Sequence, residues 1–376
     1  MNNQDKKTML DYIASCPAFI RDNVARSAEL TQPLVDEFVS GGYQNIWIVA
    51  CGSSANGALC ARQFVRRCLG CEVKLVTPFQ FVSSEHDFAP SDMVIVISQS
   101  GYSLNTLEAV RLIHEQGRRC IGLTGDTDSD LARACDVSAN YGVGRETVAY
   151  VTRGVTTLAL FFMLFAVETA AKLGRKTPEE VSALKQQLAD AADCNDAMRK
   201  AAEAFLQEHY QGLSGMTNAY VCGVGANLGT AAEGALKFSE TISIPTAAYE
   251  AEEYIHGPNI QLTPHYTVVL IDGGEGSARI HQLYEGTRIV TPNAYLLTTD
   301  PSYTGDNVLS LPCTLPDDMT PLCFLPFFQT VAYHLTEDLN RWIKHPLQRQ
   351  MEKECAAKAD GYVNSPFSED TPGRVQ

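Results

Sequence analysis

Short apolar runs without polar alternation constrain the fold of this chain most. Four of them occur in the first half, interspersed with helical stretches; they are residues 46–50 (IWIVA), 72–76 (EVKLV), 93–98 (MVIVIS) and 119–123 (RCIGL). Strands of this kind are buried on both faces, as in a parallel sheet that helices cover. The sequence therefore predicts an α/β fold, with a parallel sheet flanked by helices on both faces.

The second half of the chain echoes the first. Residues 49–56 (VACGSSAN) align with residues 220–227 (YVCGVGAN), which places Cys222 opposite Cys51 at an offset of 171 residues. Further apolar runs follow in the same order in both halves. A repeat of this length indicates a duplicated α/β unit, because solenoid repeats have periods of about 20–50 residues. The alternative is coincidence, since apolar strings next to glycine recur in many α/β proteins.

The length of 376 residues also predicts two domains, at about 100–200 residues per domain. Residues 177–180 (TPEE) are typical of a helix start, with a capping Thr, Pro in the first turn and acids at the positive end of the helix dipole. We expect an N-terminal helical segment over residues 1–25, a first domain over 26–175, a helical connector over 176–215, a second domain over 216–345 and a C-terminal tail over 346–376.

The charge balance narrows the choice of partners. The chain has 44 Asp and Glu against 29 Lys and Arg, a formal net charge of −15. Nucleic acids and anionic membranes require a basic face, so neither is expected as the main partner. A phosphorylated small molecule is not excluded, because a local nest of hydrogen-bond donors suffices to bind it.

Several features predict a cytoplasmic protein that needs no metal. The longest unbroken apolar run, residues 158–167, has half of the about 20 residues that span a bilayer. The N-terminus lacks the hydrophobic segment of a secretory signal. The twelve cysteines are therefore expected to be reduced thiols, mostly small core residues. Cys68 and Cys71 have CxxC spacing without a second pair at zinc spacing, so neither a metal nor another cofactor is predicted.

Two loops rich in hydroxyl groups follow the first and third predicted strands. They are residues 51–54 (CGSS) and 98–103 (SQSGYS), and each leads into a predicted helix. Ligands of parallel sheets bind beyond the carboxyl ends of the strands, and free N–H groups of helix N-termini attract anions. The alternative is that these residues are ordinary helix caps and turn formers. Two such loops at neighbouring strands favour an oxyanion site that needs no Lys or Arg.

The matching loops of the second half differ in charge. Residues 272–276 (DGGEG) place two carboxylates where a phosphate would need donors, and residues 223–229 match a dinucleotide fingerprint only approximately. We therefore predict one phosphate cradle for the chain, in the first domain, and none in the second.

At this point the motifs resemble a known family. CGSSANG and SQSGYSLNT resemble the signature loops of the sugar isomerase (SIS) family. Residues 233–240 (EGALKFSE), followed by His256-Gly257-Pro258, resemble a segment of the isomerase half of glucosamine-6-phosphate synthase. The resemblance covers about residues 25–350.

The resemblance implies two tandem SIS domains, each a flavodoxin-like parallel sheet, in a protein that forms homodimers. It implies a phosphosugar substrate, Glu240 and His256 as catalytic residues, and His256 donated across the dimer interface. The residues that it implies for the phosphate are Ser54, Ser98, Gln99, Ser100 and Ser103, supported by Gly52 and Ser53; Glu233 and Lys237 would support the catalytic pair.

Two departures from the synthase argue against glucosamine synthesis. Asn2 follows Met1 where the synthase has a nucleophilic cysteine, and the length leaves no room for its glutaminase domain. Aligning the tail places Met351 at the position of the synthase's imine-forming lysine, with Lys353 two places on. Both departures fit a second branch of the family, the deglycases of 6-phosphorylated Amadori compounds, which also use a Glu and a His sixteen residues apart.

Glu240 and His256 also have plainer interpretations. Glu233, Lys237 and Glu240 share one side of a helix expected over residues 227–241, where such charges usually form a solvated face. The apolar composition of that helix weakens this alternative. A lone His is usually structural or exposed. With the resemblance, we expect His256 to transfer protons in ring opening and amine departure, and Glu240 to act at C1 and C2 of the sugar.

The expected function is hydrolysis of a 6-phosphorylated ketosamine to an aldose 6-phosphate and a free amine. Two alternatives remain open. One is an aldose–ketose isomerase or aminosugar-phosphate deaminase, which would use the same cradle and carboxylate. The other is a sensor that binds phosphosugar without turnover. The tail after Asp360 carries no functional signal, and its composition suggests a loose strap or disorder.

Overall fold

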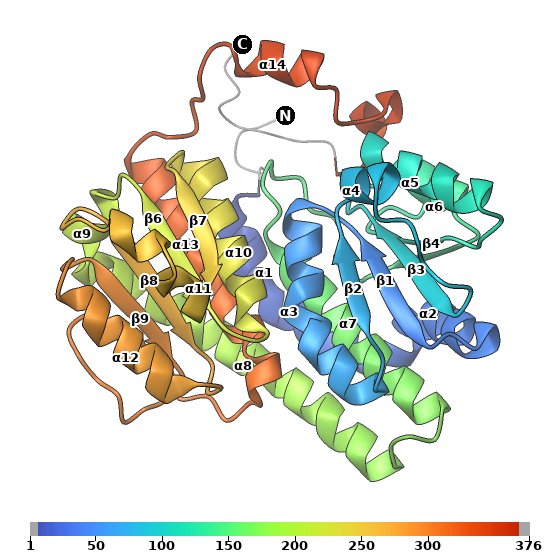
Figure 1. Ribbon diagram of the computed structural model, residues 1–376, viewed down its shortest axis with the longest axis horizontal. Helices are drawn as coiled ribbons and strands as arrows, with labels where there is room; N and C mark the ends of the chain where they lie inside the picture. Colours follow the sequence, from blue (N-terminus) through green and yellow to red (C-terminus); the bar gives the residue numbers. More distant parts are fainter. Residues whose placement is uncertain (1–6, 368–376) are drawn as a thin grey trace. The chain divides into compact units, whose positions relative to one another are not determined.

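The computed structural model describes residues 7–367 and divides into two compact units (Figure 1). The first unit contains residues 7–8, 18–189 and 344–367, and the second contains residues 9–17 and 190–343. The chain passes between the units within two helices, α1 (Met9–Ala25) and α8 (Pro178–Glu208). Each unit is built on one five-stranded sheet.

The sheet of the first unit is entirely parallel, in the order β2-β1-β3-β4-β5. This is the strand order of flavodoxin-like folds, so the predicted fold class is confirmed. The four predicted strands lie within two residues of the observed ones at each end. The strands are β1 (Asn45–Val49), β2 (Val73–Val76), β3 (Asp92–Ile97), β4 (Ile121–Thr124) and β5 (Val137–Asn140).

Helices cover both faces of this sheet. Trp47, Val49, Val94 and Val96 pack on one face against side chains of α4, α5 and α6. Successive side chains of a strand point to opposite faces, and α2, α3 and α7 pack together on the other. The helices are α2 (Ser27–Gly41), α3 (Gly52–Leu69), α4 (Pro78–Ser83), α5 (Leu104–Glu115), α6 (Asp130–Ala134) and α7 (Arg153–Lys172).

Helix α7 extends beyond the apolar run of residues 158–167 at both ends. It has 20 residues, and by length and composition alone it could cross a membrane. However, 89% of its most apolar window is buried inside the protein, against α2 and α3. Its apolar character is therefore that of a core helix.

The second unit repeats the topology of the first. Its sheet is also parallel, and the order β7-β6-β8-β9-β10 matches that of the first sheet strand for strand, as the predicted duplication requires. The strands are β6 (Ala219–Gly223), β7 (Thr246–Glu250), β8 (Thr267–Asp272), β9 (Ala294–Thr298) and β10 (Val308–Ser310). The helices are α9 (Tyr210–Ser214), α10 (Asn227–Lys237), α11 (Ala251–Ile255), α12 (Ser277–Arg288) and α13 (Pro321–Asp338).

The C-terminal segment returns to the first unit. After α14 (Gln348–Glu354), Lys358 forms an antiparallel bridge with Ser103, and Ser365 and Phe367 are buried. The expectation of a loose tail is therefore wrong for the part of it that the structure describes, up to residue 367. The rest of the tail, residues 368–376, lies outside the described residues.

The state and burial of the cysteines agree in part with the prediction of reduced, mostly buried thiols. All twelve are free thiols, and seven of them are buried, as expected of small core residues. Cys51 and Cys355 are exposed, however, and Cys135, Cys194 and Cys313 are half-buried. Burial of the Cys71 thiol raises its pKa to about 11, so this half of the CxxC pair is held in the neutral form.

Candidate functional site

The two hydroxyl-rich loops lie at adjacent strand ends of the first unit. Strands β1 and β3 are paired neighbours, so the loops that follow them open α3 and α5 at the same edge of the sheet. The side chain of Asn105, in the first turn of α5, donates to Cys51 Sγ at 3.7 Å and links the two loops. The arrangement that the sequence predicted for these loops is present.

The 98–103 loop gathers three serine hydroxyls. Ser98 Oγ donates to Ser103 Oγ at 3.1 Å and accepts from the backbone N–H of Gly101, also at 3.1 Å. Ser98 and Ser100 are nearly buried, and Ser103 is half-buried. Ser103 occupies the N-cap position of α5, yet its side chain makes no capping hydrogen bond. The interpretation of Ser103 as an ordinary cap therefore does not hold.

Gly101 allows this loop to turn. Its φ is 76°, in the left-handed region that residues with a side chain rarely adopt. A Cβ atom there would lie 1.9 Å from Ser129 Oγ, which is fixed as the N-cap of α6. Any side chain at this position would therefore clash with Ser129.

A lysine from the C-terminal segment reaches the loop. Lys358 Nζ donates to Ser100 Oγ at 3.0 Å and to Ser103 Oγ at 3.1 Å. Backbone hydrogen bonds hold the segment in place, because Leu104 N donates to Ala357 O at 3.1 Å and Ala359 N donates to Tyr102 O at 2.8 Å. The sequence predicts a cradle without Lys or Arg, with Met351 at the position of the synthase's lysine. The structure instead brings Lys358 to the cradle.

The other predicted phosphate residues lie at the start of α3 and within the 98–103 loop. Gly52 begins α3 with a φ of 57°, and Ser53 and Ser54 form its first turn, where helical N–H groups lack partners within the helix. The Gln99 side chain points toward the start of α7, since a Cβ on Gly154 would lie 2.4 Å from Gln99 Oε1. The cradle thus combines hydroxyls, a helix N-terminus and an ammonium group.

The second unit holds a buried chain of three charges. Lys237 Nζ lies 3.1 Å from Glu233 Oε1 and also donates to Glu240 Oε1. The Lys237 and Glu233 side chains are fully buried, and Glu240 is 26% exposed. The alternative of a solvated charged face is therefore wrong. Burial alone would lower the pKa of Lys237, but the negative charges of Glu233 and Glu240 raise it above its usual value.

A change in helix geometry positions Glu240. Helix α10 ends at Lys237, and residues Phe238–Ile242 form a π-helical turn instead of the expected continuation to residue 241. Such turns are rare and occur often at functional sites. Glu240 lies within this turn, three residues after Lys237, with part of its carboxylate reaching solvent.

His256 lies on the surface of the second unit. It follows α11, and its backbone N–H donates to Glu253 O at 3.1 Å. Its side chain is exposed, and the residue after it, Gly257, has a φ of 142°. The structure therefore does not bury His256 among the charges around Lys237.

The 272–276 loop, which corresponds to the cradle, is acidic in the second unit. Asp272 is buried, and its Oδ1 accepts a hydrogen bond from Ser277 Oγ at 2.6 Å. Its Oδ2 accepts from Thr298 Oγ1 at 2.7 Å and lies 2.8 Å from His281 Nε2. The Asp272 carboxylate thus accepts the hydrogen bonds that nearby hydroxyl groups could otherwise donate to a phosphate. The loss of phosphate binding from this repeat remains a prediction, and the buried carboxylate supports it.

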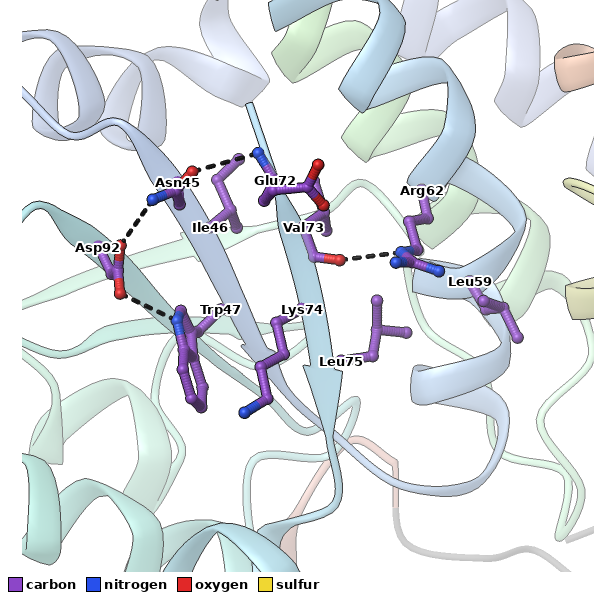
Figure 2. A pocket seen from close by; sticks show the side chains of 10 residues that line it. All are labelled: Asn45, Ile46, Trp47, Leu59, Arg62, Glu72, Val73, Lys74, Leu75 and Asp92. Carbon is purple, nitrogen blue, oxygen red and sulfur yellow. Dashed lines mark hydrogen bonds between the residues drawn. The ribbon is translucent and has the colours of Figure 1, made fainter. Parts of the chain in front are cut away.

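A hollow on the first unit lies away from the cradle. Figure 2 shows that Asp92 accepts hydrogen bonds from Asn45 and Trp47 there, at 3.0 and 3.1 Å. Asn45 and Asp92 are the first residues of β1 and β3, whereas the cradle follows the last residues of these strands. None of the predicted site residues lines this hollow.

Known proteins resemble the chain in sequence. Residues 43–167 match the family model described as "SIS domain". A glutamine–fructose-6-phosphate aminotransferase of Aeropyrum pernix is 29% identical over 306 residues, which are 78% of this chain and 48% of the relative. The corresponding protein of Thermococcus kodakarensis is 26% identical over 87% of this chain and 54% of its own length. The chain thus spans about half the length of these curated relatives.

Solved structures share the fold. The C-terminal domain of glucosamine-fructose-6-phosphate aminotransferase from Francisella tularensis has a TM-score of 0.80 at 21% identity, covering 90% of this chain and 97% of that one. Tagatose-6-phosphate ketose/aldose isomerase from Escherichia coli has a TM-score of 0.70 at 17% identity, covering 90% and 95%.

The fold is that of an α/β protein in which hydroxyl-rich loops and Lys358 meet at the carboxyl ends of the strands of the first unit. Residues 43–167 form a SIS domain, and the resemblance to the SIS family is confirmed.

Sequence reasoning missed Lys358. It lies 255 residues after Ser103, and no local motif marks it. Only the backbone bridge formed in the folded chain brings it to the cradle. The nearest hint in the sequence is the resemblance to the tail of the synthase, which places Met351 at the position of its lysine.

Proposed function

We propose that this protein is an enzyme acting on a phosphosugar, whose phosphate group binds to the first unit. The observation that carries the proposal is the convergence of the Lys358 ammonium with the hydroxyls of Ser100 and Ser103 at the start of α5. Charge-assisted hydrogen bonds and a helix N-terminus together suit a phosphate dianion. The relatives support the substrate class, because their names refer to fructose 6-phosphate and other sugar phosphates.

The reaction that we propose is hydrolysis of a 6-phosphorylated ketosamine. His256 transfers the proton that opens the sugar ring. Glu240 then takes a proton from C1 of the open-chain ketosamine and returns one to C2. The amine nitrogen loses a proton and the C2 carbonyl oxygen gains one, so the ketosamine becomes an imine at C1 with a hydroxyl at C2. Water adds to C1, the C1–N bond breaks, and His256 gives the leaving amine its proton. One water is consumed, and the products are an aldose 6-phosphate and a free amine.

The acid–base residues of the proposed reaction are Glu240 and His256. Glu240 is partly exposed, so a substrate can reach it, and its contact with Lys237 fixes its position. An exposed His256 is suited to act in the site of a partner subunit. We therefore also propose a homodimer in which each chain donates His256 to the other, as the family resemblance implies.

A panel of 6-phosphorylated ketosamines tests the proposed reaction. We expect the purified chain to release free amine and aldose 6-phosphate in equal amounts from at least one member of the panel. Interconversion of aldose and ketose 6-phosphates without amine release would contradict the deglycase and support an isomerase. Tight binding of phosphosugar without any turnover would support a sensor.

Lys358 favours a second candidate function, an isomerase or aminosugar-phosphate deaminase that forms an imine with the sugar. Borohydride reduction in the presence of fructose 6-phosphate separates the two candidates within the same experiment. For the deglycase we expect no sugar adduct on Lys358, and retained amine release in Lys358→Arg, because an arginine still binds phosphate. A covalent adduct on Lys358 would favour the second candidate.

The cradle makes a separate prediction for Ser100. In Ser100→Ala, we expect KM for the phosphosugar to rise about 10-fold or more, because a hydrogen bond to a charged group contributes about 1.5–3 kcal/mol. The melting temperature should hardly change. Ser84→Ala, which removes an exposed hydroxyl of the same unit, is the matched control. An unchanged KM in steady-state kinetics of Ser100→Ala would contradict phosphate binding at this loop.

A further inference from the structure

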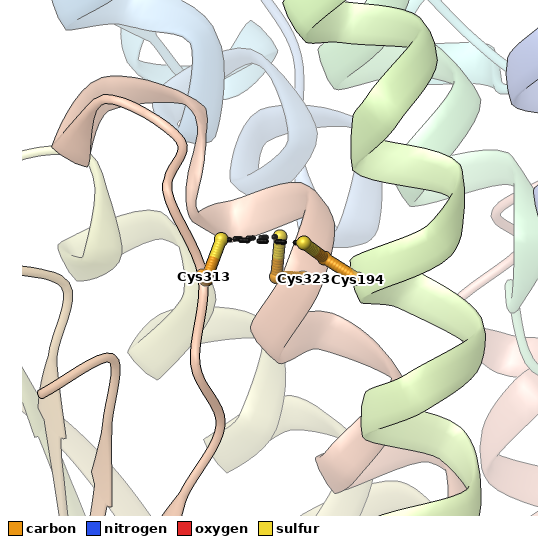
Figure 3. A group of neighbouring side chains, drawn as sticks. All are labelled: Cys194, Cys313 and Cys323. Carbon is orange, nitrogen blue, oxygen red and sulfur yellow. Dashed lines mark hydrogen bonds between the residues drawn. The ribbon is translucent and has the colours of Figure 1, made fainter. Parts of the chain in front are cut away.

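Three cysteines that are distant in the sequence meet in the second unit. Cys194 lies in α8, Cys313 in the stretch between β10 and α13, and Cys323 in the first turn of α13. Cys194 Sγ is 3.3 Å from Cys313 Sγ, and Cys313 Sγ is 3.8 Å from Cys323 Sγ. All three sulfur atoms lie within 4.8 Å of one another. Figure 3 shows the side chains pointing toward one another from three separate segments.

The core of the unit holds two of these cysteines in place. Asn195, the neighbour of Cys194, is buried and its side chain donates to Leu322 O at 2.7 Å, next to Cys323. This bond connects α8 to the start of α13 beside the sulfur atoms. Cys323 is fully buried, whereas Cys194 and Cys313 are half-buried, so one side of the group is accessible from solvent.

The three thiols share their protons unequally. Hydrogen bonds from Cys194 and Cys323 lower the pKa of Cys313 to about 3. The same contact with Cys313 raises the pKa of Cys194 to about 11, and contacts with both neighbours raise that of Cys323.

We propose that Cys194, Cys313 and Cys323 form a binding site for a thiophilic divalent cation, Zn²⁺, with three sulfur ligands and one open position. Tetrahedral zinc with Zn–S bonds of about 2.3 Å holds its sulfur ligands about 3.8 Å apart. Two of the observed separations, 3.3 and 3.8 Å, are close to this value, and the third lies within 4.8 Å. Thiolate ligands select zinc over the harder cations Mg²⁺ and Ca²⁺.

Binding of Zn²⁺ to the three cysteines exchanges protons for the metal ion. Three Zn–S bonds form, the S–H bonds of the three thiols break, and their protons pass to solvent. The bound ion would tie α8, the 311–316 stretch and α13 together, so it should stabilise the second unit. None of the three cysteines belongs to the proposed catalytic or phosphate-binding residues, so this site stands or falls separately from the proposed function.

Cobalt substitution tests the site in the full chain. The protein is reduced, stripped with a chelator and titrated with Co²⁺ under anaerobic conditions, and Zn²⁺ is then added as a competitor. We expect one equivalent of Co²⁺ to produce thiolate-to-cobalt charge-transfer bands, which Zn²⁺ abolishes. We also expect up to about three protons to be released per zinc in an unbuffered titration, and a higher melting temperature for the loaded protein.

Two variants decide the assignment. Cys313→Ser should weaken Zn²⁺ binding at least about 10-fold and remove the charge-transfer bands. Cys135→Ser is the matched control, because Cys135 is also half-buried and its sulfur lies 3.5 Å from one other sulfur, that of Cys120, so this pair offers only two ligands. Circular dichroism and melting of the metal-free variants check that they fold.

Two results would overturn the proposal. One is equal cobalt spectra for the wild type and a folded Cys313→Ser variant. The other is a fully reduced wild type that shows no thiolate–cobalt bands, while a mild oxidant removes two of its thiols. In that case the close contact between Cys194 and Cys313 forms a disulfide and not a metal site.

Discussion

Glu240→Gln is expected to lower kcat for amine release by about 10²-fold or more, because an amide cannot exchange a proton with C1 and C2 of the sugar. The substitution keeps an oxygen that accepts a hydrogen bond from Lys237, so the fold should be retained. Steady-state kinetics with the ketosamine identified by the panel is the measurement. Glu253→Gln, which makes the same change of charge at an exposed acid of the same unit, is the matched control.

Unchanged turnover in Glu240→Gln would remove Glu240 from the mechanism. A mixing experiment extends the test to the proposed exchange of His256 between subunits. If each site combines Glu240 of one chain with His256 of the other, equal mixing of inactive Glu240→Gln and His256→Asn chains restores about a quarter of the activity, because half of the dimers are mixed and each has one intact site. No recovery after verified subunit exchange would show that each chain supplies both residues to one site.

Lys237→Met is expected to have the largest effect on stability, a loss of about 3–5 kcal/mol in the free energy of unfolding. The substitution leaves Glu233 fully buried beside Glu240 with no cation between them. Denaturant unfolding measures the loss. Lys200→Met is the matched control, because Lys200 pairs with Asp196 on an exposed part of α8, and such pairs contribute about 0–1 kcal/mol.

The stability of the wild type and that of Lys237→Met should depend differently on pH. In the wild type the raised pKa of Lys237 provides stability that is present below the pKa of an unfolded lysine, about 10.4, and is lost only as the pH rises through the higher folded value. This group therefore contributes no change in stability between pH 5 and pH 8, to within about a few tenths of a kcal/mol.

In Lys237→Met, the two carboxylates repel each other, which raises their folded pKa values above about 4.3, the value of an unfolded glutamate. Stability should then fall as the pH rises from about 5 to 8, and Glu233→Gln combined with Lys237→Met should recover part of the loss. A Lys237→Met protein as stable as Lys200→Met at pH 8 would show that the buried charges are not coupled as the structure indicates.

The sequence revealed the central strands and the edge strand β2, but not the edge strands β5, β7 and β10. β1 and β3 are buried runs of Val and Ile, whose apolar character is visible in any window of sequence. β5, β7 and β10 are short and half-buried, with sequences such as VSAN and TAAYE. An edge strand pairs on one side only, so its residues need not be continuously apolar. The missing strands were therefore set by pairing with a neighbour and not by composition.

The candidate site also has parts that a local sequence pattern predicts and parts that only the folded chain brings together. The serines of the 98–103 loop are contiguous, and the turn that Gly101 permits brings them together, so a local pattern was enough to predict them. Lys358 reaches the loop only through a backbone bridge to Ser103, and the three cysteines meet only through the packing of α8 and α13. The π-helical turn at Glu240 was also missed, because residues 238–242 are ordinary helix formers by sequence.

The bridge between Ser103 and Lys358 has a consequence for the order in which the protein matures. A ribosome adds Lys358 to the chain 255 residues after Ser103, when the strands of the first unit have long been synthesised. The sheet can therefore form early, with a serine loop that still lacks its ammonium group. The complete cradle arises only after the second unit has also been translated, so a truncated product can be well folded at its N-terminal end and still bind phosphate poorly.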